Sequence, residues 1–216
     1  KFRNLMMLIC KMREVDIKFN FIDDNFYLFK NSSIPQFGDI KNSIKVLNFF
    51  IKKILLNVNT PEFGPKIYIR REDASYRKIL NEADLIDKLK KNNFEIINPQ
   101  HFEILEQMKI FSNAKTIISP YGSNLSNIIF CKKGTKIVEI SPEFNSDYEK
   151  NISSRYYNIA NILDLEFQSI KADSVDVEKH SKLAKKYIHP KILGQSNYYK
   201  NMILKISDID ELINNL

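Results

Sequence analysis

The chain has 216 residues, of which 44% are hydrophobic and 12% aromatic, and this composition excludes a globally disordered protein. Its net charge of +7 favours partners that carry phosphate, although the lysines are spread along the chain and a solvated lysine surface is the alternative interpretation. Cys10 and Cys131 are too few for a disulfide framework and lack metal-ligand spacing, so we expect a reducing compartment.

There is little sign of a membrane segment in the sequence. No apolar run approaches the roughly 20 residues that a spanning helix needs. The opening KFRNLMMLIC has basic residues before apolar ones, but it is too short for a signal peptide and no cleavage site follows. We therefore expect a cytoplasmic protein, with peripheral association at the inner face of the membrane through lysines as a second expectation.

The first third of the chain is irregular. Its periodicity predicts one helix over residues 40–56. Pro61, Gly64 and Pro65 then interrupt both helix and strand, which predicts a linker or domain edge over residues 57–65. Beyond it, short β-rich runs alternate with helical runs. The expected strands are 66–70, 94–98, 115–119, 136–140 and 166–170, and the expected helices are 81–92, 102–114, 124–131 and 153–164.

This alternation with short loops predicts an α/β fold, with a Rossmann-like parallel sheet flanked by helices on both faces. We expect residues 61–172 to form that domain. Residues 1–60 precede it, and residues 173–216 are predicted to be a C-terminal helical tail whose last helix carries Ile209 and Leu212.

The loop after the first expected strand is rich in arginine. Ligands of open parallel sheets bind at the carboxyl ends of the strands, where this loop lies. Arg70, Arg71 and Arg77 follow one another within it, and guanidinium groups bind phosphate oxygens bidentately. Ion pairs with Glu72 or Asp73 are the alternative interpretation of the same residues.

The stretch SPYGSNLSNIIF, residues 119–130, joins an expected strand to an expected helix. Pro120 ends the strand, and Gly122 can take a backbone conformation that is closed to other residues. The free amides of the following helix favour an anion, and Ser123 and Asn124 can cap the helix or donate to phosphate oxygens. The stretch lacks the GxGxxG and P-loop signatures, and an ordinary turn is the alternative interpretation.

Two further features bear on the expected site. Glu139 lies in the apolar run KIVEI, where a buried carboxylate needs a partner such as a sugar hydroxyl or a core arginine. Gln107 raises the same question within its helix. The three histidines, His101, His180 and His189, form no cluster with cysteine or carboxylate, so we expect no metal site.

These motifs together resemble glycosyltransferase family 61. The resemblance rests on IRREDASYRKILNEADL and on EILEQMKIFSNAKTIISPYGSNLSNIIFCKKGTKIVEISP, and it covers about residues 66–170. The family includes EGF-domain O-linked N-acetylglucosamine transferases, plant xylan-decorating transferases and bacterial capsular polysaccharide enzymes. The resemblance implies a GT-B architecture of two Rossmann-like lobes, a donor nucleotide held by the C-terminal lobe, an inverting reaction and no metal requirement.

Carried onto this chain, the resemblance implies a set of residues that bind the donor. Arg70 or Arg77 would neutralise the departing nucleotide diphosphate, where negative charge develops in the transition state. The catalytic base of such enzymes often comes from the other lobe, so none is assigned. The implied donor-binding residues are Arg70, Arg77, Asn81, Gln107, Tyr121, Gly122, Ser123, Asn124, Leu125, Asn127 and Glu139.

The chain departs from the family pattern at two points. Tyr121 stands where the family has histidine, and a tyrosine is neither a cation nor a general base near neutral pH without a large pKa shift. About 65 residues precede the donor lobe, too few for a complete N-terminal acceptor lobe, which is therefore short or missing. We expect residues 1–60 to be a remnant of that lobe and a connecting helix. Because the chain also starts without methionine, a fragment of a longer protein is one explanation.

Three functions remain open from the sequence. The first is an inverting glycosyltransferase that moves a sugar from a nucleotide-diphosphate sugar to a polysaccharide or glycoconjugate. The second, suggested by Tyr121, is a sugar-nucleotide-binding module without catalytic activity. The third is a nucleic-acid-binding protein, which the basic charge alone suggests and for which no recognition motif is present, so we expect no nucleic-acid partner.

Overall fold

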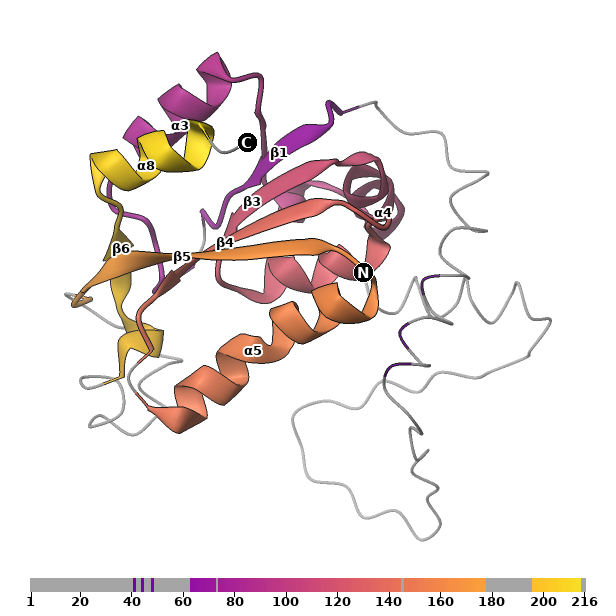
Figure 1. Ribbon diagram of the computed structural model, residues 1–216. Coiled ribbons are helices and arrows are strands. Elements are labelled where there is room, and N and C mark those ends of the chain that lie inside the picture. Colours follow the sequence, from indigo (N-terminus) through magenta and orange to yellow (C-terminus); the bar gives the residue numbers. More distant parts are fainter. Residues whose placement is uncertain are drawn as a thin grey trace, which may run out of the picture.

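A six-stranded sheet lies at the centre of the computed structural model, with the strands in the order β2-β1-β3-β4-β5-β6 (Figure 1). The structure describes residues 63–72, 74–144, 146–177 and 196–214, together with Lys41, Ile44 and Asn48. Strands β1 to β5 run parallel to their neighbours, and β6 pairs antiparallel with β5. The strands are β1 (Lys66–Ile69), β2 (Glu95–Ile97), β3 (Thr116–Pro120), β4 (Lys136–Pro142), β5 (Glu166–Val175) and β6 (Asn201–Ile203).

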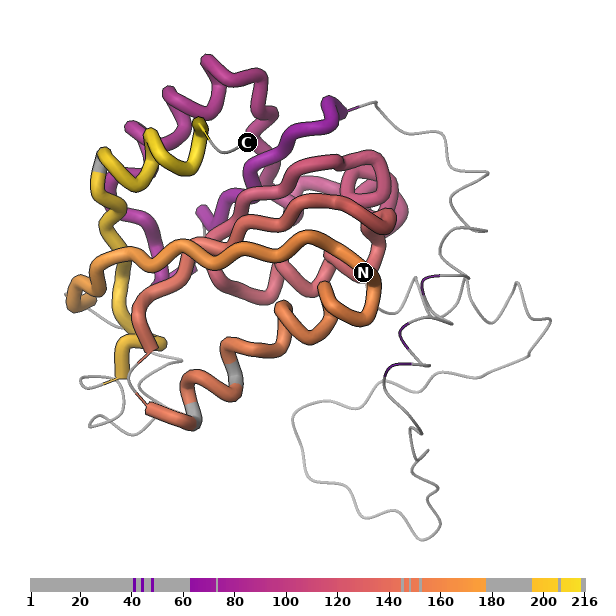
Figure 2. The backbone as a smooth tube through the Cα atoms, in the orientation of Figure 1, coloured from indigo at the N-terminus to yellow at the C-terminus, as the bar shows by residue number. Residues whose placement is uncertain are grey.

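Helices cover both faces of this sheet (Figures 1 and 2). One layer contains α3 (Glu82–Lys91) and α8 (Ile206–Asn214), which lie side by side. The other contains α4 (Ile104–Asn113), the 3-10 helix η2 (Ser123–Phe130) and α5 (Asp147–Ile162). Two short 3-10 turns, η1 (Pro99–His101) and η3 (Asn197–Tyr199), complete the described elements. The predicted α/β fold, with a mostly parallel sheet between helices, is confirmed.

The sheet separates two hydrophobic cores because side chains alternate along each strand. In β3, Ile117 packs with α4 and η2 whereas Ile118 packs with α3 and α8. Every residue of β3 is buried, as expected for a central strand covered by helices on both sides. The five predicted strands are all present, and β4 and β5 extend a few residues further than their apolar runs indicate.

The C-terminal part differs from the helical tail predicted for residues 173–216. Strand β5 continues to Val175, and β6 adds a strand before the confirmed final helix α8. The three-residue run of β6 is too short to show a period, yet its Met202 is fully buried in the core beneath α8. Residues 178–195 lie outside the described residues.

The N-terminal part of the chain is largely outside the described residues, including most of the helix predicted for residues 40–56. Lys41, Ile44 and Asn48 are helical, in agreement with that prediction. The Asn48 side chain donates to the carbonyl oxygen of Ile129 at 2.7 Å, which places this residue against the end of η2. The predicted division into domains stays a prediction.

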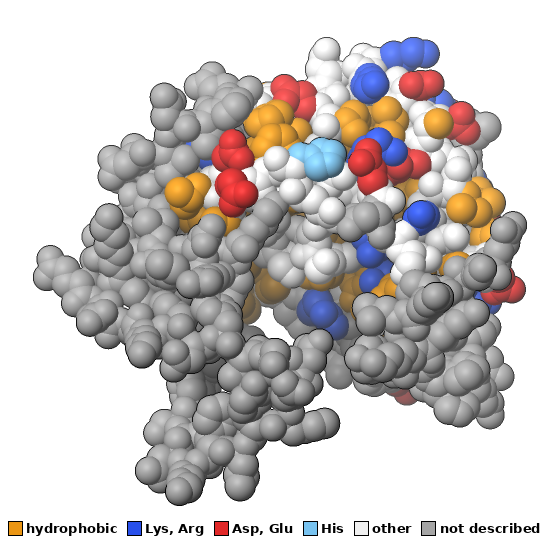
Figure 3. Space-filling view, turned by 180° about the vertical axis from the view of Figure 1, so that it is seen from behind, with side chains coloured by type: hydrophobic (Ala, Val, Ile, Leu, Met, Phe, Trp, Pro, Cys, Tyr) orange, Lys and Arg blue, Asp and Glu red, His pale blue; other side chains and the backbone are white. Residues whose placement is uncertain are grey.

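The described surface carries charges of both signs. Figure 3 shows basic, acidic and apolar side chains interspersed on one face. Lys133 pairs with Asp164 at 3.2 Å, Lys200 pairs with Asp176 at 3.1 Å, and Lys88 pairs with Asp210. No helix of the described residues is both long enough and apolar enough to cross a membrane.

Candidate functional site

A pocket of about 230 Å³ opens beyond the carboxyl ends of β1 and β3. This is the edge at which parallel α/β sheets bind ligands. Four of its lining side chains are basic and two are acidic, so the pocket carries a positive balance. The lining residues are Arg70, Arg71, Glu72, Arg77, Lys78, Ile79, Glu82 and Pro120.

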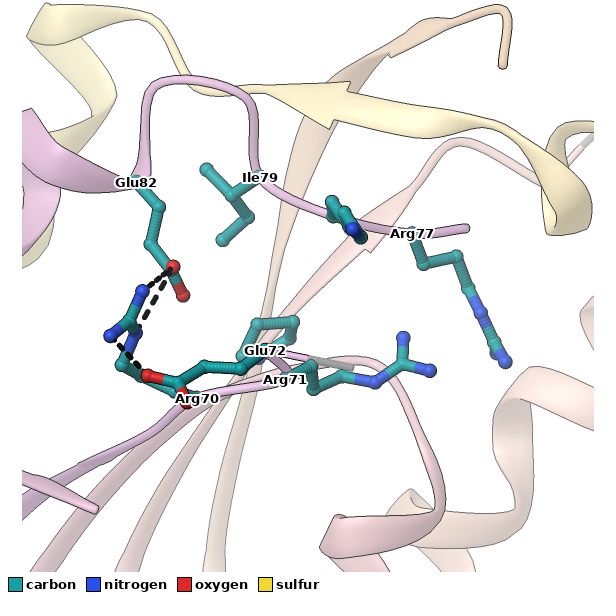
Figure 4. Close-up of a pocket in the computed structure, with 8 residues that line it drawn as sticks. Arg70, Arg71, Glu72, Arg77, Ile79 and Glu82 are labelled. Carbon is teal, nitrogen blue, oxygen red and sulfur yellow. Dashed lines mark hydrogen bonds and ion pairs between the residues drawn. The ribbon is translucent and has the colours of Figure 1, made fainter. Parts of the chain in front are cut away.

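Arg70 lies in the pocket wall but its charge is already balanced. Its guanidinium donates to Glu82 from Nη2 at 3.0 Å and from Nε at 3.2 Å, and it also pairs with Glu72 (Figure 4). Glu82 accepts a further hydrogen bond from the hydroxyl of Tyr68 at 2.8 Å. The ion-pair interpretation of this arginine is therefore the one that the geometry favours.

Arg71, by contrast, has no carboxylate partner among the described residues. Its Nη1 donates to the carbonyl oxygen of Tyr121 at 3.0 Å, and its side chain extends towards that of Arg77 (Figure 4). Burial, followed by the positive charge of Arg77, lowers the pKa of Arg71 to about 10. Arg71 is therefore a largely buried cation that lies close to a second cation.

Gly122 lies directly against Arg71. A Cβ atom on Gly122 would come within 2.7 Å of the Arg71 Nε atom and 2.9 Å of its Cζ atom. The backbone of Gly122 is extended, with φ 170° and ψ 175°, a conformation open to any residue. The expectation of a glycine-only conformation is therefore wrong, because what requires glycine here is the approach of the arginine side chain.

Arg77 is the second cation without a carboxylate partner among the described residues. Its side chain is only 5% exposed, and its Nε atom has no hydrogen-bond partner in the described part of the chain. Its Cζ atom lies 4.3 Å from the ring centroid of Tyr198, 4.9 Å from that of Tyr76 and 5.0 Å from that of Tyr121. Its φ of 58° is left-handed, which costs a non-glycine residue on the order of 1–3 kcal/mol.

Tyr121 belongs to the aromatic cluster behind the pocket and does not line the pocket. Its side chain is 1% exposed and makes edge contacts with Phe144 and Tyr156, whose ring centroids lie 5.4 and 5.5 Å away. Burial raises the pKa of Tyr121 well above its usual value. The phenol is therefore neutral near pH 7 and unsuited to act as a general base.

Glu139 is buried in β4, on the sheet face that also carries Tyr121. Its carboxylate Oε2 has no hydrogen-bond partner among the described residues. Burial raises the pKa of Glu139 to about 7, against the opposing effects of Lys171, a hydrogen bond from Ser169 and the charge of Arg77. The carboxyl group therefore changes its ionisation near neutral pH, beside one of the two arginines.

Three predicted donor-binding residues have side chains that bind other parts of the chain. Asn81 donates to the carbonyl oxygen of Leu204 at 2.7 Å and accepts from its amide at 3.1 Å, and it makes no side-chain cap for α3. Gln107 donates to the carbonyl oxygens of Pro99 and Phe102, at 2.7 and 2.9 Å. Asn127 donates to Gln107 at 3.0 Å. These bonds join the start of α3 to the segment after β6, and α4 to η1 and η2.

The start of η2 also differs in detail from expectation. Neither Ser123 nor Asn124 caps it through a side chain, because the N-cap position falls on Gly122. Asn124 instead donates to the carbonyl oxygen of Arg70 at 3.3 Å, Ser123 is exposed, and Leu125 is fully buried in the core. The segment that was expected to be a short helix is a 3-10 helix throughout.

The structure thus brings Arg70 and Arg77 to the pocket and places Tyr121 and Gly122 behind it. It adds Arg71, which the expected set of donor-binding residues leaves out although it stands in the same arginine run, and the tyrosine rings of Tyr76 and Tyr198. No local signal marks Tyr198, because its role depends on a contact with a residue 121 positions earlier in the chain. Within the described part of the chain, no group of three or more histidine, cysteine or acidic side chains is placed to hold a metal ion.

Comparison with known sequences identifies the family of this chain. The family described as Glycosyltransferase 61 matches residues 25–138, which is more than half of the chain. The chain belongs to glycosyltransferase family 61. The family match includes Arg71, Arg77 and Gly122 and ends one residue before Glu139, so Tyr198 lies outside it.

Several curated proteins are similar to part of this chain. The EGF domain-specific O-linked N-acetylglucosamine transferases of Pan troglodytes and Bos taurus are each 29% identical to it over 101 residues, and that of Mus musculus is 28% identical over 101 residues. These alignments cover 42% of the chain and 19% of each relative. The family 61 chain therefore spans about a fifth of the length of these relatives.

Proposed function

We propose that this family 61 chain is the donor-binding lobe of an inverting glycosyltransferase of GT-B architecture. In this proposal it binds a nucleotide-diphosphate sugar, and the sugar passes to a hydroxyl group of a polysaccharide or glycoconjugate. The observation that carries the proposal is the pair Arg71 and Arg77, two guanidinium groups in one pocket with no carboxylate partner among the described residues.

The chemistry of the transfer explains why such a pair is useful. The acceptor oxygen forms a bond to the anomeric carbon while the bond from that carbon to the diphosphate oxygen breaks, and the hydroxyl proton passes to a base outside the described residues. Negative charge grows on the departing diphosphate. Two fixed guanidinium groups stabilise that charge without a metal ion.

Arg71 and Arg77 differ from Arg70 in a way that sharpens the proposal. Arg70 is balanced by Glu82 and Glu72, so an incoming phosphate would have to compete with two carboxylates. Neither Arg71 nor Arg77 forms an ion pair with a carboxylate in the described part of the chain, although the charge of Arg77 acts on Glu139. Bringing two cations together costs free energy that a dianionic diphosphate would recover. We therefore assign the diphosphate to Arg71 and Arg77, and a supporting role to Arg70.

A nucleotide titration tests the proposal. We expect a nucleoside diphosphate from a panel of UDP, GDP, CDP and ADP to bind the chain saturably in calorimetry. Arg71→Ala and Arg77→Ala should each weaken binding by about 10–100-fold, the effect of losing a charge-assisted hydrogen bond. Lys133→Ala removes an exposed cation at the opposite edge of the sheet and should change the affinity less than twofold. Equal affinity in all four proteins would contradict the assignment.

A second candidate is a sugar-nucleotide-binding module without catalytic activity. The buried, neutral Tyr121 favours it, because no titratable side chain at this position faces the pocket. The two candidates predict the same nucleotide binding but differ in turnover. Release of nucleoside diphosphate from a panel of sugar donors, measured with glycan acceptors present, would support the enzyme, and binding without release would support the module.

A further inference from the structure

The C-terminal segment, residues 196–204, packs against the loop that carries Arg77. The backbone amide of Arg77 donates to the carbonyl oxygen of Lys200 at 2.9 Å, and the amide of Met202 donates to the carbonyl oxygen of Lys78 at 2.8 Å. Leu80 donates back to Met202 at 2.8 Å. These bonds hold the left-handed backbone of Arg77 in place, so the strained residue depends on a segment far away in the sequence.

The same segment also sets the direction of the Arg77 side chain. Among the three rings around the guanidinium, that of Tyr198 is nearest, at 4.3 Å. The Tyr198 backbone is itself held, since its amide donates to Glu149 of α5 at 3.3 Å and to Ser196 at 3.2 Å. Its ring contacts those of Tyr121 and Tyr199, with centroids 5.9 and 5.0 Å away. A fixed ring therefore lies over the cation.

We propose that Tyr198 is a positioning residue for the anion site, holding the Arg77 guanidinium towards Arg71 so that the pair receives a diphosphate group. The inference rests on the proposed function. In the described structure, the Arg77 Nε atom has no hydrogen-bond partner and the guanidinium forms no ion pair with a carboxylate. The direction of this side chain therefore depends on its contacts with the tyrosine rings. Because the Arg77 side chain is already ordered, less conformational entropy is lost when the anion binds.

Inorganic pyrophosphate is the probe, because it reports on the diphosphate subsite alone. In calorimetry on the whole chain, Tyr198→Leu should weaken pyrophosphate binding about fivefold, the effect of losing a cation–π contact. Tyr198→Phe keeps the ring and should bind within twofold of wild type. Tyr157→Leu removes a half-exposed tyrosine from the outer face of α5 and serves as the matched control.

A double variant separates positioning from a general structural effect. If Tyr198 acts through Arg77, the pair Arg77→Ala with Tyr198→Leu should bind pyrophosphate no more weakly than Arg77→Ala alone. An equal fivefold loss with and without Arg77 would overturn the inference, as would wild-type affinity in Tyr198→Leu. Wild-type affinity in Arg77→Ala would instead overturn the proposed function, so the two failures are distinguishable.

A measurement on the unmodified chain keeps the inference testable if Tyr198→Leu fails to fold. The amides of Arg77 and Met202 donate the hydrogen bonds that join the Arg77 loop to the C-terminal segment. If pyrophosphate binds only when this segment holds Arg77 in place, it should slow hydrogen exchange at both amides. The amide of Gly134, which donates to Asp164 at 2.9 Å at the other edge of the sheet, should exchange at an unchanged rate. Exchange that is slowed nowhere, or equally at all three amides, would contradict the inference.

Discussion

The role of Gly122 is set by its neighbour. Because its backbone is extended, an added side chain would not strain φ and ψ but would displace the Arg71 guanidinium from 2.7 Å away. We expect Gly122→Val to weaken nucleoside diphosphate binding about tenfold, comparable to losing part of one charge-assisted contact. Calorimetry on the folded variant measures the effect.

The control for this prediction is the Arg71→Ala variant, in which a side chain at position 122 no longer meets a guanidinium group. In Arg71→Ala, the guanidinium that the new valine side chain would strike is missing, so adding Gly122→Val should cost less than a further twofold. A tenfold loss in both backgrounds would mean that Gly122 acts through its own backbone and not through Arg71.

The raised pKa of Glu139 predicts that the free energy of unfolding depends on pH. Burial of the carboxyl group sets the sign of this dependence. Its pKa is raised from 4.5 to about 7 in the folded chain, so between these values the folded state holds a proton that the unfolded state releases. The free energy of unfolding therefore falls as the pH rises from about 4.5 to 7. Above pH 7 the carboxylate is ionised in both states, and the free energy of unfolding stays at its lowered value. The positive charges of Lys171 and Arg77 act in the opposite direction and reduce this loss of stability without removing it.

We expect Glu139→Gln to raise the free energy of unfolding at pH 8 by on the order of 3 kcal/mol, since the pKa rises from 4.5 to about 7 and one pKa unit corresponds to about 1.4 kcal/mol. At pH 4 the variant and the wild type should be nearly equal, because glutamine resembles the protonated acid. Urea unfolding at both pH values measures this. The exposed Glu166→Gln serves as control, and equal gains from Glu139→Gln at pH 4 and pH 8 would contradict a buried ionisation.

At the scale of elements, the sequence is informative where a run is long and apolar. Residues 115–119 and 136–140 read as strands because β-branched residues dominate them, and they form β3 and β4 at the centre of the sheet. Strand β6 has only three residues, and its pairing with β5 involves partners about 28 positions earlier. A contact of this kind leaves no period in the sequence and is visible only in three dimensions.

The candidate site shows the same limit at the level of motifs. The arginine run and the glycine turn lie together in the structure, as the sequence predicts, because the carboxyl ends of parallel strands meet at one end of the sheet. Within those motifs the sequence does not separate Arg70, whose charge two carboxylates balance, from Arg71, which has no carboxylate partner among the described residues. Partner choice depends on Glu82 at the start of α3, and therefore on tertiary geometry.

At the scale of the whole molecule, the second core reaches the arginine pocket through Ile79, but none of the described residues of α8 lines that pocket. Leu212 of α8 is 3% exposed and packs in the core beneath α3, and it lines no part of the arginine pocket. We expect Leu212→Ala to lower the free energy of unfolding by about 2–4 kcal/mol, the usual cost of a cavity at a buried leucine. Its affinity for nucleoside diphosphate, measured at 15 °C where the variant is folded, should stay within twofold of wild type.

If Leu212→Ala instead lost affinity in proportion to its loss of stability, this prediction would be contradicted. The position of the arginines would then depend on the whole fold and not on the C-terminal segment alone. The neighbouring exposed Glu211→Ala controls for changes at the surface of α8 and should alter neither quantity. Tyr198→Leu is the complementary case, because there the affinity should fall more than any loss of stability explains. Leu212→Ala and Tyr198→Leu together test whether anion binding at the strand ends is independent of the packing of α8 in the second core.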